Sequence, residues 1–110
     1  MYKRQDGAKE RAAAALRNLA SQNAENKVAI AKAGAVDPLV ALLRTGADGA
    51  KEQAAGALKN LACGAESRAV VAQALSLSAT ASKRDVDAAI DKIGQFDPSA
   101  RLGFRGNLLT

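Results

Sequence analysis

The feature that most constrains the fold is a segment that occurs twice in the chain. Residues 6–20 read DGAKERAAAALRNLA, and residues 48–62 read DGAKEQAAGALKNLA. Twelve of the fifteen positions are identical, and the offset between the two copies is 42 residues throughout. Periods of this length are typical of helical repeat proteins, in which each repeat packs only on its neighbours.

Each copy has the apolar spacing of an amphipathic helix. In the first copy Ala12, Leu16 and Leu19 fall at positions i, i+4 and i+7, and the second copy repeats them. Asp6 and Asp48 precede the two stripes, where the N-terminus of a helix favours negative charge. Val and Ile nowhere form the alternating runs that strands need. The chain is therefore predicted to be all-α.

Two further segments complete the repeating unit. The sequence AENKVAIAKA at 24–33 parallels AESRAVVAQA at 65–74, now at an offset of 41 residues. Between the copies lies GAVDPLVALLRTG, in which Gly34 can end one helix and Asp37 can cap the next. Pro38 would then stand in the first turn, where a missing N–H costs little. The unit is thus predicted to contain three helices.

These patterns define a set of helices and a core built from leucine. Helices are predicted at 8–20, 25–33, 37–44, 49–62, 66–74 and 84–93. The predicted core consists of Leu16, Leu19, Leu39, Leu42, Leu43, Leu58 and Leu61.

The stretch AGAVDPLVALLRTGADGAKEQAAGALKNLA closely resembles the second and third helices of the armadillo-repeat family, in the alanine-rich style of plant and algal members. The preceding NKVAIAKA resembles the family's first helix, and the resemblance covers about residues 6–74. It implies a right-handed α-solenoid of about one and two-thirds three-helix repeats. It also implies that the chain binds other proteins.

The resemblance stops after Ala74, and the chain is predicted to divide there. Residues 1–74 would form the armadillo-type repeats, and residues 75–94 a Ser/Thr/Ala-rich linker and one additional helix. Residues 95–110 contain Pro98 and two glycines without a helical period, so we expect an extended C-terminal tail.

The tail carries candidate partner-binding residues. Phe96 and Phe104 are two of the three aromatic residues in the chain, and Arg101 and Arg105 add positive charge. Apolar groups of this size gain free energy on docking, which favours an arm that contacts a different chain. The alternative is that the two phenylalanines fold back and cap the end of the solenoid.

Nothing in the sequence indicates catalysis. The chain has no histidine, which excludes triads and metal sites that need imidazole, and it has no Gly-rich phosphate loop. Asp85, Asp87 and Asp91 do not have the spacing of a calcium loop, and Lys83 lies one turn before Asp87, which favours an ion pair. We therefore predict no enzymatic activity, no metal and no cofactor.

Charge and cysteine content limit which kinds of partner and which cellular compartments fit the sequence. The net charge is +5, but the basic residues are scattered and lack interleaved aromatics, so a nucleic-acid partner is disfavoured. No apolar run approaches the length that spans a bilayer. The single cysteine forms no internal disulfide, which fits an intracellular protein and does not separate the cytoplasm from an organelle such as a plastid.

The same asparagine stands in both copies of the repeated helix. Asn18 and Asn60 occupy positions that in an armadillo repeat hold the backbone of a bound peptide, and this role is carried over by the resemblance alone. Their amides offer both a donor and an acceptor. A structural role, such as a bond to a neighbouring segment, is the alternative. With Arg11 and Gln53 they complete the candidate protein-binding residues of the repeats.

In peptide-binding armadillo proteins of the nuclear-import type, a tryptophan precedes this asparagine by four residues. Here those positions are Ala14 and Gly56, so no indole is present to stack on a lysine stem. The predicted function is therefore a non-catalytic interaction or scaffold module, a small linker subunit built into a larger complex of protein chains. The alternative is an auxiliary subunit on the soluble face of a photosynthetic or respiratory membrane assembly, with membrane association only through a partner.

Overall fold

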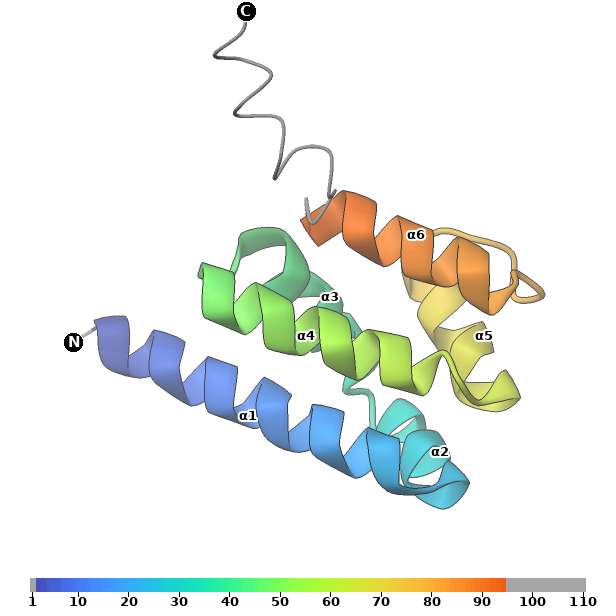
Figure 1. The fold of residues 1–110 in the computed structure, drawn as a ribbon, viewed down its shortest axis with the longest axis horizontal. Coiled ribbons are helices and arrows are strands. Elements are labelled where there is room, and N and C mark those ends of the chain that lie inside the picture. Colours follow the sequence, from blue (N-terminus) through green and yellow to red (C-terminus); the bar gives the residue numbers. More distant parts are fainter. Residues whose placement is uncertain (1, 95–110) are drawn as a thin grey trace, which may run out of the picture.

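The computed structural model describes residues 2–94 and shows six helices in that range (Figure 1). They are α1 (Tyr2–Gln22), α2 (Ala24–Lys32), α3 (Val36–Thr45), α4 (Asp48–Leu61), α5 (Ala65–Ala74) and α6 (Lys83–Gly94). No strand occurs among the described residues. The all-α prediction is confirmed, and every predicted helix is present. The bounds agree to within two residues, except that α1 begins six residues before the predicted start.

The predicted helix caps are partly wrong. Asp6 lies inside α1, because that helix already begins at Tyr2. The N-cap of α3 is Ala35, without a side-chain bond, so Asp37 lies in the first turn and does not cap the helix. Acidic residues still stand in the first turns of α3 and α4, where they interact favourably with the helix dipole.

The turns between helices follow from local chemistry. Asn23 is the N-cap of α2, and its side-chain oxygen accepts a 2.7 Å hydrogen bond from the backbone N–H of Asn26. Gly34 has a φ of +86°, a conformation that disfavours residues with a Cβ, and it ends the segment after α2 as predicted. These two short turns connect α1 to α2 and α2 to α3 within few residues, and α2 packs on α1.

The two copies of the repeated segment pack against each other as α1 and α4. Figure 1 shows them side by side and running in the same direction. Buried alanines, among them Ala13 and Ala20 of α1 and Ala54 and Ala57 of α4, line the helices. Small side chains let helix axes approach closely, so the alanine-rich repeat serves this contact.

The remaining helices pack around α4. α3 lies against one side of α4, and α6 packs on α3, α4 and α5. Lys59 of α4 forms a 2.7 Å ion pair with Asp91 of α6. Within α6, Lys83 donates a 2.5 Å hydrogen bond to Asp87, the pair predicted from their spacing. This bond raises the pKa of Lys83 above its ordinary value.

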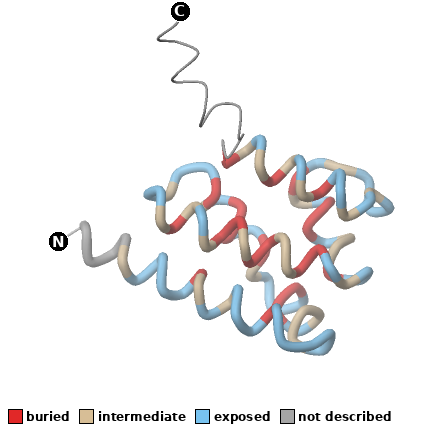
Figure 2. The backbone as a smooth tube through the Cα atoms, viewed as in Figure 1, coloured by how far each residue is buried: buried red, intermediate tan, exposed pale blue. Residues whose placement is uncertain are grey.

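Burial is concentrated on the inner faces of α3, α4, α5 and α6, whereas much of α1 is exposed (Figure 2). Four predicted core leucines, Leu39, Leu43, Leu58 and Leu61, are buried as expected, and Leu16 and Leu42 are half-buried. The prediction for Leu19 is wrong, because its side chain is 44% exposed. Its counterpart Leu61 is fully buried, so the difference comes from neighbouring helices and not from the local sequence.

None of the helices in the described part of the chain has both the length and the apolar character needed to cross a membrane. The tail residues Phe96, Arg101, Phe104 and Arg105 lie outside the described residues.

The counterpart leucines provide a matched stability test. Leu61→Ala removes a fully buried side chain, and we expect it to lower the free energy of unfolding by about 2–5 kcal/mol. Leu19→Ala makes the same change at an exposed position, where we expect a loss of less than about 1 kcal/mol. Urea denaturation of both variants measures the difference, and equal losses would contradict the assigned burial.

Candidate partner-binding surface

The four predicted residues of the repeats stand on one face of α1 and α4. Arg11 and Asn18 are seven residues apart on α1, and Gln53 and Asn60 have the same spacing on α4. A separation of seven residues is close to two helical turns, so each pair lies on one face. Because α1 and α4 are packed together, these residues make up a continuous surface, called here the α1–α4 surface.

Asn60 links the two helices. Its side-chain Nδ2 donates a 2.9 Å hydrogen bond to the backbone carbonyl of Arg17 in α1. This is the structural role that the sequence left open, a bond to a neighbouring segment. The side-chain oxygen of Asn60 accepts no hydrogen bond from the described residues, so one half of the amide stays open to a ligand.

The side chain of Asn18 forms no such bond to a neighbouring helix in the described part of the chain. Its side chain is exposed and makes no hydrogen bond within residues 7–94, where side chains are described. Its backbone carbonyl accepts a 2.7 Å hydrogen bond from the hydroxyl of Ser21. Asn18 and Asn60 are equivalent in the repeat, and within the described helices only Asn60 stands beside a preceding third helix. The amide thus has a structural role in α4 and no described partner in α1.

Arg17 crosses from α1 to α4 and lies against Gly56. A methyl group at Gly56 would lie 2.6 Å from Cδ of Arg17, so glycine is what lets the arginine stem approach the helix. The guanidinium donates a 3.2 Å hydrogen bond to the side-chain oxygen of Gln53. In this chain, therefore, an arginine side chain occupies the surface beside Gly56, and sequence analysis did not predict that contact.

Some of the basic side chains on the α1–α4 surface form ion pairs and others do not. Lys59 is neutralised by Asp91, whereas Arg11 and Arg17 form no ion pair within the part of the chain whose side chains are described. Glu10 lies against Gly49 in the first turn of α4, where the helix dipole favours a carboxylate. The surface beside Asn18 therefore retains positive charge and would repel a basic segment.

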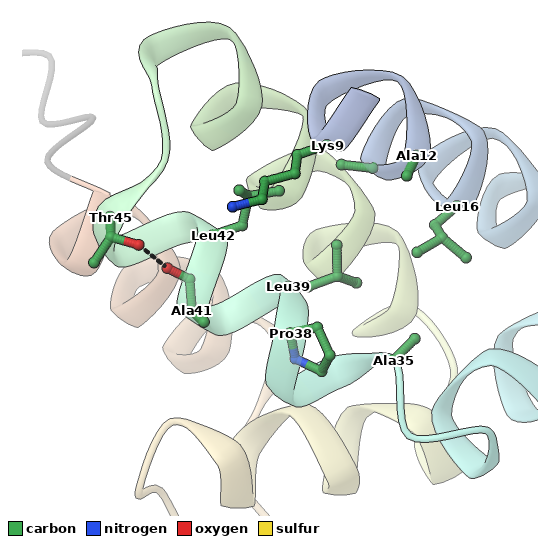
Figure 3. Close-up of a pocket in the computed structure, with 10 residues that line it drawn as sticks. Lys9, Ala12, Leu16, Ala35, Pro38, Leu39, Ala41, Leu42 and Thr45 are labelled. Carbon is green, nitrogen blue, oxygen red and sulfur yellow. Dashed lines mark hydrogen bonds between the residues drawn. The ribbon is translucent and has the colours of Figure 1, made fainter. Parts of the chain in front are cut away.

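A second feature was missed by sequence reasoning. An apolar groove with a volume of about 430 Å³ lies between α1 and α3 (Figure 3). Ala12, Ala13 and Leu16 of α1 line it on one side, and Pro38, Leu39 and Leu42 of α3 on the other. The sequence held a hint of this groove. Ala12 and Leu16 belong to the apolar stripe that occurs again in α4, and their counterparts there, Ala54 and Leu58, are fully buried.

Comparison with known protein families identifies one repeat in this chain. Residues 23–63 match the family model of the Armadillo/beta-catenin-like repeat. This range begins at the N-cap of α2 and runs through α3 to just beyond the end of α4. No curated protein and no solved structure matches the chain. Residues 23–63 therefore form an armadillo-like three-helix repeat within an all-α helical solenoid.

Proposed function

We propose that this protein is a non-catalytic interaction module that binds another protein chain along the α1–α4 surface. The observation that carries the proposal is the exposed side chain of Asn18, beside the half-used amide of Asn60, on the repeated helix of an armadillo-like solenoid. An amide offers a donor and an acceptor to the backbone of an extended segment, whatever its sequence. The alanine-rich armadillo type is part of this proposal.

The unpaired charges suggest the chemistry of the partner. Arg11 is exposed, and Arg17 is held by a neutral side chain, Gln53. A partner segment with acidic side chains would find two guanidinium groups next to the asparagine amides, and Arg is well suited to bind carboxylates. We therefore propose a neutral or acidic extended segment as the ligand.

Photo-cross-linking locates the partner contact first. A photoreactive amino acid in place of Asn18 is expected to cross-link a second polypeptide in cells, whereas the same group in place of exposed Gln73 on α5 is not. Once the partner is identified, Asn18→Ala should weaken its binding by about three- to tenfold, the share of one hydrogen bond. Because the Asn18 side chain has no bond in the described fold and alanine favours the helix, the thermal midpoint should not fall.

Asn60→Ala serves as the comparison, since it removes a bond within the fold as well as the proposed contact. It should lower both the affinity and the thermal midpoint. Unchanged affinity in Asn18→Ala, at a cross-linked site, would contradict the assigned role of the amide.

We further propose that the protein acts as a small linker subunit of a larger complex, with the tail as an arm on a different chain. An auxiliary subunit on the soluble face of a membrane assembly is the alternative, and it predicts that the protein sediments with a particulate fraction. Two open apolar surfaces, on α1 and on α6, favour a protein that other chains complete.

Truncation after Gly94, where α6 ends, tests the arm. The shortened chain should keep its helical circular dichroism but lose co-purification with the complex, because Phe96, Phe104 and the two tail arginines are removed. Full affinity after truncation would contradict the arm proposal, and loss of helicity would show instead that the tail caps the solenoid.

A further inference from the structure

The groove between α1 and α3 lies at a position that the repeat would fill with a helix and that no described helix fills. Ala54 and Leu58 of α4 are fully buried, and α3 packs against that helix. Their counterparts at the 42-residue offset are Ala12, which is exposed, and Leu16, which is half-buried (Figure 3). No described helix packs on α1 as α3 packs on α4. By repeat symmetry, the groove has the shape left by the second helix of a preceding repeat.

The other end of the described fold offers such a second helix. The α3 segment VDPLVALL and the α6 segment VDAAIDKI are separated by 50 residues and have apolar side chains at the same first, fourth, fifth and eighth positions. In addition, α6 follows α5, the counterpart of α2, in the order in which α3 follows α2. α6 therefore has the order and the apolar spacing of a second helix, reached through a longer connection. It differs from α3 in packing directly on α4, the third helix before it, whereas α3 packs hardly at all on α1.

The burial of α6 shows which of its sides is open. All four apolar positions of the α3 segment are buried. In α6 the first and fifth, Val86 and Ile90, are fully buried, but the fourth and eighth, Ala89 and Ile93, are only half-buried. These two residues and Leu77 line a depression of about 440 Å³ at the end of the fold. Within residues 2–94, the open side of α6 is thus the side on which no third helix packs.

We propose that copies of this chain associate end to end, so that α5 and α6 of one copy and α1 of the next form a composite three-helix repeat. The described helices run in the order third, then first to third, then first and second. One end therefore lacks what the other end provides. In Figure 1, α1 and α6 lie on opposite sides of α4, as such stacking requires.

The groove itself lies on the side of α1 away from Asn18. Successive residues of a helix are rotated by about 100°, so Leu16 and Asn18 point to nearly opposite sides of α1. The proposal therefore does not depend on the partner proposed above. The two ends differ, so the contact is heterologous and does not close in a dimer unless the rotation allows it. The assemblies should grow with concentration.

Three exposed alanines allow a matched set of variants. Ala12→Glu places a carboxylate in the groove, and Ala88→Glu places one in the depression on α6. Ala29→Glu on α2 adds the same charge away from both surfaces and is the control. Glutamate favours helix, and each position is exposed, so all three variants should fold with the wild-type circular dichroism spectrum.

Sedimentation velocity of the full chain, from low micromolar to millimolar concentration, measures the assembly. The wild-type chain and Ala29→Glu should show sedimentation coefficients that rise with concentration. Ala12→Glu and Ala88→Glu should each raise the dissociation constant at least about tenfold, so that their sedimentation coefficients rise only at correspondingly higher concentration, because a carboxylate would be buried in an apolar contact.

Mixing the two interface variants gives the decisive result. Ala12→Glu keeps an intact α6 end, and Ala88→Glu keeps an intact groove, so their mixture should form a 1:1 dimer and nothing larger. A wild-type chain that stays monomeric throughout would overturn the proposal. So would a mixture that stays monomeric, or a wild-type assembly that Ala88→Glu leaves unchanged, since the groove would then bind something other than α6.

Discussion

The close contact between α1 and α4 is the interaction on which the rest of the fold depends. Neither helix has a broad stripe of large apolar side chains, and each contributes mostly alanine to the contact. Ala13 and Ala20 are buried on α1, and Ala54 and Ala57 are buried on α4. Alanine contributes little buried area by itself, so its value here is the short distance it allows between helices. Leu58 and Leu61, farther along the α4 stripe, are fully buried in the core.

The same contact explains the two kinds of exposed surface. Stacking two third helices side by side brings the repeated asparagines and Gln53 onto one face, tied together by the bond from Asn60 to Arg17. It also leaves α1 at the edge of the stack, with Leu16 half-buried and Leu19 exposed. A repeat buries its apolar positions only where a neighbour is present, so identical sequence gives different burial at the edge and in the middle.

Because burial in a repeat depends on the adjacent helices, some features of this fold could be predicted from the sequence and others could not. Helix positions follow from local apolar spacing and turn residues, so the presence of all six helices and the turn at Gly34 were predicted correctly, although α1 begins six residues before its predicted start. The burial of Leu19 was not, because the sequence of residues 6–20 cannot tell a covered helix from an edge helix. The packing of Arg17 on Gly56 was missed for the same reason: the residues are far apart in sequence, and only the stacking brings them together.

Ala57 of α4 and its counterpart Ala15 of α1 test the central contact most directly. Ala57 is fully buried one turn from Gln53 and Asn60, which both bond Arg17 of α1, whereas Ala15 is exposed. Ala57→Leu should lower the free energy of unfolding by about 1–3 kcal/mol, because a tight helix contact does not accommodate added methylenes. Ala15→Leu should change it by no more than about 0.5 kcal/mol. Urea denaturation of the two variants measures the difference, and an Ala57→Leu chain as stable as Ala15→Leu would contradict the stacking of α1 on α4.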